Sequence, residues 1–198
     1  MLALRDAGKI VPPCYPSLGT ANRWGAGMIS VALARSAADF EIFAEFDRKF
    51  GQWDAEISPS HGVSAEDTKT LFHPDKSGSE LAARFGRQDA GMLLARVDGI
   101  PAGCFGFEPF GDDAAELGKF FVDAPFRGQG IGRELMKAVM AEIGKGRRRT
   151  VLIHTTFYMK SAIALYTAFG FEPCARFRDT PERVMHTDVF MSRVLPPR

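Results

Sequence analysis

The sequence predicts a single mixed α/β domain. Segments in which every second residue is apolar alternate along the chain with segments of helical spacing, as expected for strands and helices packed in layers. Two apolar runs are joined by Asp98-Gly99, a dipeptide that favours a tight β-hairpin. A glycine-rich stretch, residues 128–132, stands between an apolar strand and an amphipathic helix, which predicts a strand–turn–helix unit.

Length and charge limit the classes of function. The 198 residues suit one domain with a substantial core. Lys and Arg number 25 against 24 Asp and Glu, which gives a formal net charge of +1. A chain so close to neutral has no overall field to hold nucleic acid or an anionic membrane, so we expect neither partner. No apolar run approaches the roughly 20 residues needed to span a bilayer.

The three cysteines predict neither a disulfide framework nor a metal site. Cys14, Cys104 and Cys174 are odd in number, widely spaced and in no CxxC arrangement. We therefore expect no metal and a cytoplasmic location. The basic run "KGRRR", residues 145–149, is interpreted as solvated cations at the C-terminal end of a helix, where they complement the helix dipole.

The first elements are an extension, a strand and a helix. Residues 1–27 are rich in proline and glycine without a sustained period, so we expect a loosely ordered extension before a domain over 28–198. Residues 28–35 alternate as a strand does, and residues 36–54 follow with helical spacing. Ser36 or Asp39 suits the N-cap of this helix. Its apolar face is formed by Phe40, Phe43, Ala44 and Phe46.

A second helix and a hairpin complete the first half of the domain. Residues 54–76 are polar and irregular, with weak helical character. Residues 77–86 then predict a short helix that ends at Gly86. Residues 91–110 form the two strands of the hairpin.

The second half alternates strands and helices, which gives the overall order β-α-α-β-β-β-α-β-α-β. The expected elements are a strand over 114–123, a helix over 131–143, a strand over 149–156, a helix over 159–169 and a last strand over 184–195.

The glycines before the helix at 131 indicate a phosphate site. Glycine inside a helix costs roughly 1 kcal/mol relative to alanine, so Gly128, Gly130 and Gly132 predict that the backbone itself is needed there. Backbone N–H groups at a helix N-terminus point in one direction, at the positive end of the helix dipole, and bind phosphate. Arg127 and Arg133 add positive charge on either side.

Spacing separates three designs for such a site. A Walker loop ends in Gly-Lys-Ser/Thr, whereas Arg133-Glu134 follows Gly132 here. A dinucleotide fingerprint would place its third glycine at Arg133. The pattern that remains is R-x-x-G-x-G, from Arg127 to Gly132.

This pattern resembles the GNAT family of acyl-CoA N-acyltransferases. The resemblance is carried by "RGQGIG" preceded by "FFVDAPF", and by a second motif, "SAIALYTAFGFEP", from Ser161 to Pro173. It implies a GNAT fold, in which a mostly antiparallel, splayed mixed sheet has helices on both faces.

The resemblance also implies how acetyl-CoA would bind. Backbone groups of Phe120, Phe121 and Val122 would pair with the pantetheine arm, which inserts where two parallel strands splay apart. Met159 stands where many relatives have an asparagine that helps position the cofactor. The residues implied around the pyrophosphate are Arg127, Gly128, Gln129, Gly130, Ile131, Gly132 and Arg133.

The catalytic candidates are an acid and one of two bases. Tyr166 occupies the family's tyrosine position, where a phenol with a pKa of about 10 can protonate the departing CoA thiolate. A base must deprotonate the incoming ammonium, because only a free amine attacks a thioester. His154 stands where many relatives carry a carboxylate, and Glu116 matches a glutamate common in similar sequences. Both remain candidates, either directly or through water.

Each of these side chains also has a purely structural interpretation. Tyr166 could be a core aromatic, His154 a paired strand histidine and Glu116 a solvated carboxylate near a strand end. The other histidines show no ligand spacing, and we expect them on the surface or in loops; they are His61, His73 and His186.

We therefore expect direct transfer of an acetyl group from acetyl-CoA to a primary amine. Cys104 alternates with apolar residues and is predicted to be buried, so no covalent acyl-enzyme is expected. The acceptor, a small-molecule amine or a peptide, is not specified, because acceptor-facing loops vary on a common scaffold. The alternative is a non-catalytic acyl-CoA-binding sensor. A homodimer, common in similar folds, is left open.

Overall fold

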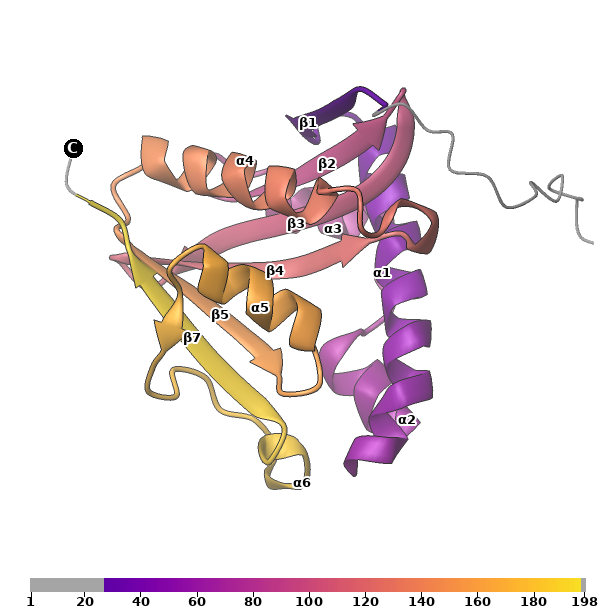
Figure 1. Ribbon diagram of the computed structural model, residues 1–198, viewed down its shortest axis with the longest axis vertical. Helices are drawn as coiled ribbons and strands as arrows, with labels where there is room; N and C mark the ends of the chain where they lie inside the picture. The colour runs from indigo at the N-terminus through magenta and orange to yellow at the C-terminus, as the bar shows by residue number, and fades with distance from the viewer. Residues whose placement is uncertain (1–26, 197–198) are drawn as a thin grey trace, which may run out of the picture.

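A mixed sheet forms the middle layer of the molecule (Figure 1). The computed structural model describes residues 27–196, so the expected extension over 1–27 lies outside the described residues apart from Gly27. The strands follow the order β1-β2-β3-β4-β5-β7-β6 in one sheet. Their bounds are β1 (Ile29–Leu33), β2 (Gly91–Val97), β3 (Ile100–Phe110), β4 (Ala114–Val122), β5 (Thr150–Thr156), β6 (Glu172–Pro173) and β7 (Asp188–Val194).

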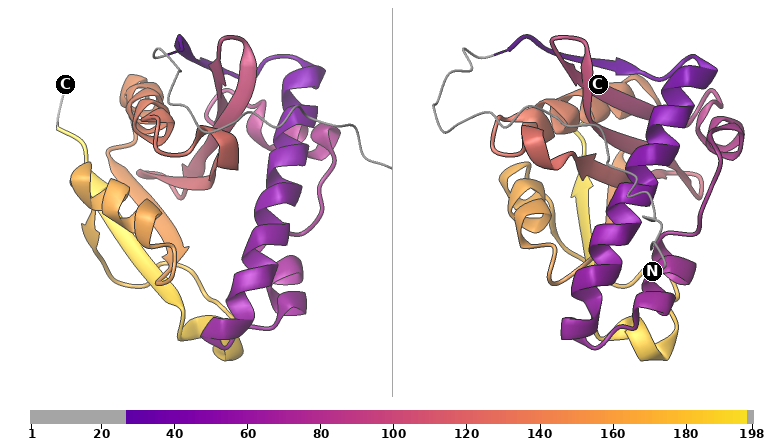
Figure 2. Two further views of the ribbon diagram at one scale, coloured as in Figure 1. Left: turned by 45° about the vertical axis from the view of Figure 1, so that its right-hand side comes forward. Right: turned by 90° about the vertical axis from the view of Figure 1, so that its right-hand side faces the viewer.

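Helices cover both faces of this sheet (Figure 2). One face carries α1 (Ala37–Ile57) and α3 (Gly78–Phe85), and we name it the α1–α3 face. The other carries α4 (Ile131–Lys145) and α5 (Lys160–Ala168), and is named the α4–α5 face. The shorter helical segments are η1 (Ser58–His61), α2 (Ala65–Asp67), the π-helix η2 (Thr68–Phe72), η3 (Ala124–Phe126) and α6 (Glu182–Met185).

Local sequence signals place most of these elements where they were predicted. Ser36 caps α1 in a capping box with Asp39, so the expected helix start is confirmed. Asp98 and Gly99 both adopt positive φ, 51° and 84°, which is the geometry of a two-residue hairpin turn. The last strand begins later than expected, at Asp188, because the residues before it form α6. The two-residue strand β6 was not predicted, since it is too short to show a period.

The strands β4 and β5 form the one parallel pair among the described strands, and they soon part. Their pairing runs from Ala114↔Thr150 to Leu117↔Ile153 and stops there, although both strands continue. The register of β3 and β4 shifts just beyond this point, where Lys119 has a φ of +57°. A bulge of this kind bends its strand, so β4 turns away from β5 after Leu117 (Figure 1). We call this place the β4–β5 divergence.

The two faces have different cores. On the α4–α5 face, helix residues such as Leu135 and Val139 pack on a sheet core that includes Val151 and Ile153. On the α1–α3 face, the sheet residues in the core come from β2, β3 and β4, with none from β5 or β7 among the described residues; they are Met92, Leu94, Cys104 and Phe121. Cys104 is 3% exposed, so its expected burial is confirmed.

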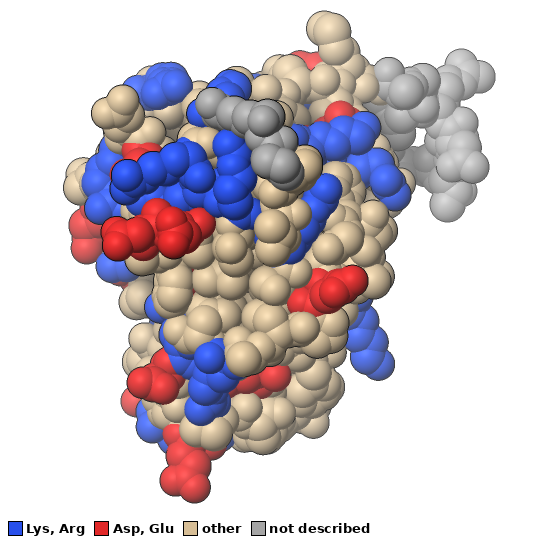
Figure 3. All heavy atoms as spheres, turned by 90° about the vertical axis from the view of Figure 1, so that its left-hand side faces the viewer, with Lys and Arg blue, Asp and Glu red and all other residues tan. Residues whose placement is uncertain are grey.

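Basic and acidic side chains lie next to each other at the C-terminal end of α4 (Figure 3). Lys145 pairs with Glu142 at 2.6 Å, and Arg148 with Asp89 at 3.4 Å. The basic run 145–149 is therefore partly neutralised by its neighbours. Within residues 27–196, no helix is long and apolar enough to cross a membrane.

Candidate functional site

The glycine turn, residues 127–132, needs its glycines for two different reasons. Gly128 and Gly130 adopt φ values of +77° and +84°, a region that L side chains rarely adopt. A β-carbon at either position would meet nothing within 4 Å, so the backbone angle, and not crowding, requires glycine. At Gly132 a β-carbon would lie 3.0 Å from Cζ of Phe120, so this glycine allows α4 to pack closely on β4.

The turn presents a row of unpaired backbone donors. Gly130 is the N-cap of α4 and supplies no side-chain cap. The first hydrogen bond of the helix is donated by Arg133 N–H to the Gly130 carbonyl, at 2.9 Å. The N–H groups of residues 128–132 find no acceptor within the described part of the chain. They stand at the positive end of the α4 dipole, which is the arrangement that binds an anion.

The longer side chains of the turn are held against the protein. Arg127 donates from Nε to the Val122 carbonyl at 3.0 Å, and Gln129 donates from Nε2 to the Pro125 carbonyl at 3.0 Å. The Arg133 guanidinium lies over the ring of Phe169, 5.8 Å from the ring centre. The backbone N–H groups of the turn are thus joined by the guanidinium N–H groups of Arg127 and Arg133 that these contacts leave unbonded.

The end of β4 presents an open strand edge toward the β4–β5 divergence. Asp123 N–H donates to the Ala102 carbonyl at 2.9 Å, which fixes the alternation of hydrogen bonds between β3 and β4. By this alternation Phe121 pairs with β3, whereas the backbone groups of Val122 point to the other side, and Phe120 lies in the bulge without a β3 partner. Pairing with β5 has ended at Leu117, so this side of β4 can accept an extended ligand, with the Val122 carbonyl also accepting the hydrogen bond from Arg127 Nε.

Tyr166 lies on α5 beside this edge. Its side chain is buried, 5% exposed, and its ring centre is 6.1 Å from those of both Phe120 and Phe171. The hydroxyl bonds to no other described residue, yet it is not among the fully enclosed unpaired atoms, so it reaches accessible space. Burial raises the pKa of Tyr166 above that of an ordinary phenol. The hydroxyl is therefore protonated at neutral pH. Met159 is the N-cap of the same helix.

The two candidate bases lie on the face opposite to Tyr166. Val151 and Ile153 belong to the same core as Tyr166, so His154 points to the α1–α3 face. Glu116 lies opposite Leu152, two residues from His154, and shares this face. The structure thus places both candidates on one face at the β4–β5 divergence, with Glu116 one residue before the last paired position and His154 one residue after it.

Both candidate bases have charged or polar partners. His154 Nε2 lies 2.9 Å from Asp188 Oδ1, and its ring stacks on Phe190 with 4.6 Å between ring centres. The second oxygen of Asp188 accepts hydrogen bonds from Arg176 and Thr180. Glu116 forms an ion pair with Arg178, which belongs to the loop that follows β6.

A buried charge cluster beside the divergence was missed by the sequence interpretation. His73 lies in the loop between η2 and α3, as one of the two expectations had it, but its side chain is only 7% exposed. Its Nε2 lies 3.0 Å from Asp54 Oδ2, and its Nδ1 lies 3.7 Å from Asp47 Oδ1. Both Asp47 oxygens accept from Lys119 Nζ at 2.7 Å, and Asp54 Oδ1 accepts from Tyr158 at 3.0 Å.

The charged groups of the buried cluster stabilise one another in their ionised forms. Burial opposes a charge on His73, but the carboxylates of Asp47 and Asp54 outweigh it and raise the pKa of His73. Burial likewise opposes the charge on Asp47, but His73 and Lys119 outweigh it and lower the pKa of Asp47. The one signal in the sequence was the spacing of Asp47 and Asp54, seven residues apart on the apolar side of α1.

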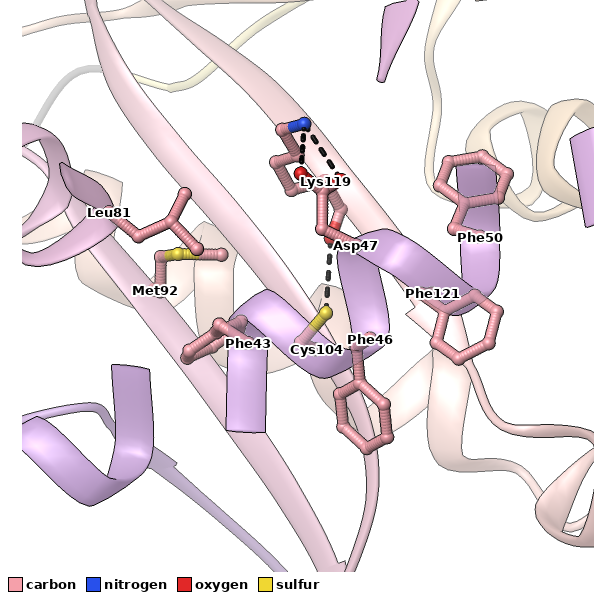
Figure 4. A pocket seen from close by; sticks show the side chains of 9 residues that line it. All are labelled: Phe43, Phe46, Asp47, Phe50, Leu81, Met92, Cys104, Lys119 and Phe121. Atoms are coloured by element: carbon pink, nitrogen blue, oxygen red, sulfur yellow. Dashed lines mark hydrogen bonds and ion pairs between the residues drawn. The ribbon is translucent and has the colours of Figure 1, made fainter. Parts of the chain in front are cut away.

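The small cavity next to this cluster is too small for an acceptor. It lies between α1 and the sheet, and its lining includes Asp47, Lys119 and Cys104 (Figure 4). Its volume is about 10 Å³, close to the space of one water molecule. Within residues 27–196, no group of three or more His, Cys, Asp or Glu side chains is placed to hold a metal ion.

The fold and the site define the class of protein. Three features together are those of an acyl-CoA N-acyltransferase fold. They are a mixed sheet with a divergent parallel pair, an anion-binding turn at a helix N-terminus, and a tyrosine beside the open strand edge. The sequence model of the Acetyltransferase (GNAT) family matches residues 57–171, more than half of the chain. The chain therefore belongs to the GNAT family of acetyltransferases, and the predicted family, fold and enzyme class are confirmed.

Individual relatives agree with this assignment. The uncharacterized N-acetyltransferase YjgM of Escherichia coli is 26% identical over 120 residues, 59% of this chain and 71% of that protein. The IAA acetyltransferase of Azospirillum brasilense is 28% identical over 149 residues, 73% of this chain and 86% of that protein.

Solved structures share the fold. An acetyltransferase of the GNAT family from Staphylococcus aureus superposes with a TM-score of 0.66 at 18% identity, over 85% of this chain and all of that one. The PaiA N-acetyltransferase of Thermoplasma acidophilum, in complex with coenzyme A, gives 0.66 at 18% identity, over 84% and 99% of the two chains.

Proposed function

We propose that this enzyme transfers an acetyl group from acetyl-CoA directly to a primary amine of a small molecule or a peptide. The observation that carries the proposal is the row of unpaired N–H groups over residues 128–132, next to the β4–β5 divergence. This row suits a pyrophosphate, and the open edge of β4 suits a chain of amide groups. The cytoplasmic location expected from the cysteines belongs to the same proposal.

The residues of the site divide into a binding set and a proton-transfer set. The backbone of residues 128–133 would hold the pyrophosphate, with Arg127 and Arg133 adding charge. Phe120 and Val122 would pair with the pantetheine amides, and Met159 would flank them at the start of α5. Acetyl-CoA supplies a thioester, which is an activated acyl group with a good leaving group.

Proton transfer would use both faces of the sheet. Glu116 or His154 would take a proton from the acceptor ammonium on the α1–α3 face. The freed amine would then form a C–N bond to the acetyl carbon while the C–S bond breaks. Tyr166 would donate its hydroxyl proton to the departing sulfur, and the second proton lost from the acylated nitrogen would restore the Tyr166 hydroxyl. Asp188, which pairs with His154, would hold that imidazole in place if His154 is the base.

The test is a calorimetric titration with acetyl-CoA, followed in the same samples by thiol release across a panel of amines. Binding with release supports the proposal, and binding without release for any amine supports the acyl-CoA sensor. Failure to bind acetyl-CoA would exclude both.

Tyr166→Phe tests the acid. We expect acetyl-CoA binding to be retained and kcat to fall by about 100-fold or more, because a positioned general acid contributes on that scale. Tyr158→Phe is the matched control: it removes a hydroxyl that bonds Asp54 and should lower stability by about 1–2 kcal/mol without a comparable loss of kcat. An unchanged kcat in Tyr166→Phe would remove Tyr166 from the mechanism.

A further inference from the structure

Two glutamate–arginine pairs lie side by side on the α1–α3 face. Glu108 on β3 lies directly opposite Glu116 on β4. Like charges in this position repel each other, so each needs its own counter-ion. Arg84 of α3 pairs with Glu108, and Arg178 of the loop after β6 pairs with Glu116.

The two pairs are not equivalent. Arg84 donates hydrogen bonds to both carboxylate oxygens of Glu108, one from Nε at 3.0 Å and one from Nη2. Arg178 contacts a single oxygen of Glu116, so the other oxygen is not bonded to any side chain in the described part of the chain. Glu116 also stands one residue before the last paired position of β4 and β5, Leu117↔Ile153. The pair held by a single hydrogen bond is thus the one next to the divergence.

We propose that the Glu116–Arg178 pair is the acceptor site and that it selects a zwitterion, a free L-α-amino acid. This inference rests on the function proposed above. The acceptor ammonium would bind Glu116, and its carboxylate would bind the Arg178 guanidinium, whose fork geometry matches a carboxylate. The Arg178 side chain is 43% exposed, so it is accessible to such a ligand.

Charge balance favours a zwitterion over a simple amine. A cationic amine at Glu116 would compete with Arg178 for one carboxylate and place two cations side by side. A zwitterion inserts between Glu116 and Arg178 and gives each of them an opposite charge. A peptide N-terminus has no carboxylate next to its ammonium and would leave Arg178 unpaired. The neighbouring carboxylate of Asp188 is already engaged by His154, Arg176 and Thr180.

Aromatic rings beside the pair indicate the side chain of the acceptor. Phe177 lies edge-on to Phe110 at 5.2 Å and to Phe190 at 5.1 Å, measured between ring centres. All three rings are half-buried, and the Arg178 guanidinium lies 5.9 Å from the Phe110 ring. A side chain at Cα of a ligand held by Glu116 and Arg178 would meet this apolar wall. The site therefore favours an apolar amino acid.

The transfer step balances with these groups. A proton moves from the acceptor ammonium to a Glu116 oxygen, so that an N–H bond breaks and an O–H bond forms. The amine lone pair forms the C–N bond to the acetyl carbon as the C–S bond breaks, and Tyr166 protonates the sulfur. The acylated nitrogen then loses its second proton, which restores the Tyr166 hydroxyl, and Glu116 releases its proton to solvent. The product amide carries no positive charge, so it no longer matches Glu116 after the carboxylate is restored. Arg178 can then pair with Glu116 again.

The test compares amino acids with their decarboxylated amines. Thiol release is measured with the twenty L-amino acids, and L-phenylalanine and L-leucine are paired with 2-phenylethylamine and 3-methylbutylamine. We expect at least one apolar amino acid to exceed its amine in kcat/KM by about tenfold or more, since a charge-assisted pair is lost with the carboxylate. Calorimetric titration of that amino acid into the CoA-saturated protein should show the same preference in binding.

Variants assign the preference to Arg178. Arg178→Gln should raise KM for the amino acid by roughly 10- to 100-fold while changing KM for the amine by less than about threefold, and Arg178→Lys should restore part of the loss. Arg183→Gln is the matched control, because Arg183 lies in the same C-terminal region and pairs with Asp67 at an exposed site. It should leave both KM values unchanged.

Three results would overturn the inference: equal or better turnover of amines or peptides that lack the carboxylate, no turnover of any amino acid, or an unchanged KM in Arg178→Gln. The acetyl-CoA titration separates this failure from failure of the proposed function. If acetyl-CoA binds and simple amines react while amino acids do not, the acetyltransferase proposal stands and the zwitterion site is excluded.

Discussion

The two sides of the site are built in different ways. Around the glycine turn, contacts are local: Arg127 bonds Val122 five residues away, and Gln129 bonds Pro125 four residues away. On the α1–α3 face the contacts are long-range: Asp47 and Lys119 are 72 positions apart in the sequence, and Glu116 and Arg178 are 62 positions apart. The first side is made mainly of backbone in a fixed conformation, and the second of side chains brought together by the fold.

The two sides also differ in how they carry charge. On α4, Lys137 and Glu134 form an exposed pair one turn apart, with side chains 56% and 39% exposed. In the buried cluster, Lys119 and Asp47 are 15% and 9% exposed. Exposed pairs contribute little to stability, whereas an ion left alone in a buried site is costly. The difference leads to three predictions, which are ordered by the size of the effect.

The largest effect is expected for Asp47→Asn. Removing this carboxylate leaves Lys119 and a protonated His73 without their shared counter-ion, so the free energy of unfolding should fall by about 3 kcal/mol. Chemical denaturation measures it. Lys137→Gln is the control on the other side and should stay within about 0.5 kcal/mol of the parent. A cost of less than about 1 kcal/mol for Asp47→Asn would show that the buried cluster is no more stabilising than a surface pair.

A smaller effect is expected for Gly130→Val. The turn requires a φ of +84° at this position, and a valine backbone is strained there. The backbone donors should therefore lose their alignment, and the Kd for acetyl-CoA should rise roughly 10- to 100-fold. Calorimetry provides the measurement. Gly144→Ala lies at the other end of α4, where a β-carbon meets nothing within 4 Å, and should leave the Kd unchanged. Unaltered binding in Gly130→Val would mean that the turn does not hold the ligand.

The smallest effect is a dependence of stability on pH. The pKa of His73 is raised above its ordinary 6.5, so its contribution is complete below that pH and is lost as pH rises through the raised value. The pKa of Asp47 is lowered from 3.8, so its contribution is complete above that pH and is lost on further acidification. The cluster should therefore stabilise the fold most between about 4 and 6.5.

Denaturation midpoints measured from pH 5 to 9 check this dependence. The parent should lose stability toward the alkaline end, and His73→Gln should flatten that loss. His186→Gln changes an exposed histidine and should keep the parent profile. A parent profile that stays level from pH 6 to 9 would contradict the pairing of a charged His73 with the two carboxylates.

Much of the first side could be predicted from the sequence because its determinants lie close together in the chain. The start of α4 after Gly130 follows from a few adjacent residues, as do two local features elsewhere in the fold, the hairpin at Asp98-Gly99 and the capping box at Ser36. The helical period of residues 159–169 likewise placed Tyr166 on a helix, whereas its contact with Phe120 at the end of β4 appears only in the fold. The roles of Tyr166, His154 and Glu116 in the reaction stay predictions.

The second side could not be predicted because its contacts depend on strand register and loop path. Spacing in the sequence gives no reason to bury His73 next to Asp54, or to place Arg178 on Glu116 across 62 residues. Gly132 is a smaller example, because its contact with Phe120 appears only when α4 packs on β4.

The sequence by itself thus determined the longer elements, the family resemblance and the anion-binding turn, since backbone conformation and amphipathic period are properties of short segments. The tertiary structure decided which charges are buried, which side of the sheet each candidate base faces and which arginine each glutamate meets. Those pairings act through space over a few ångströms, and only the folded chain fixes such distances.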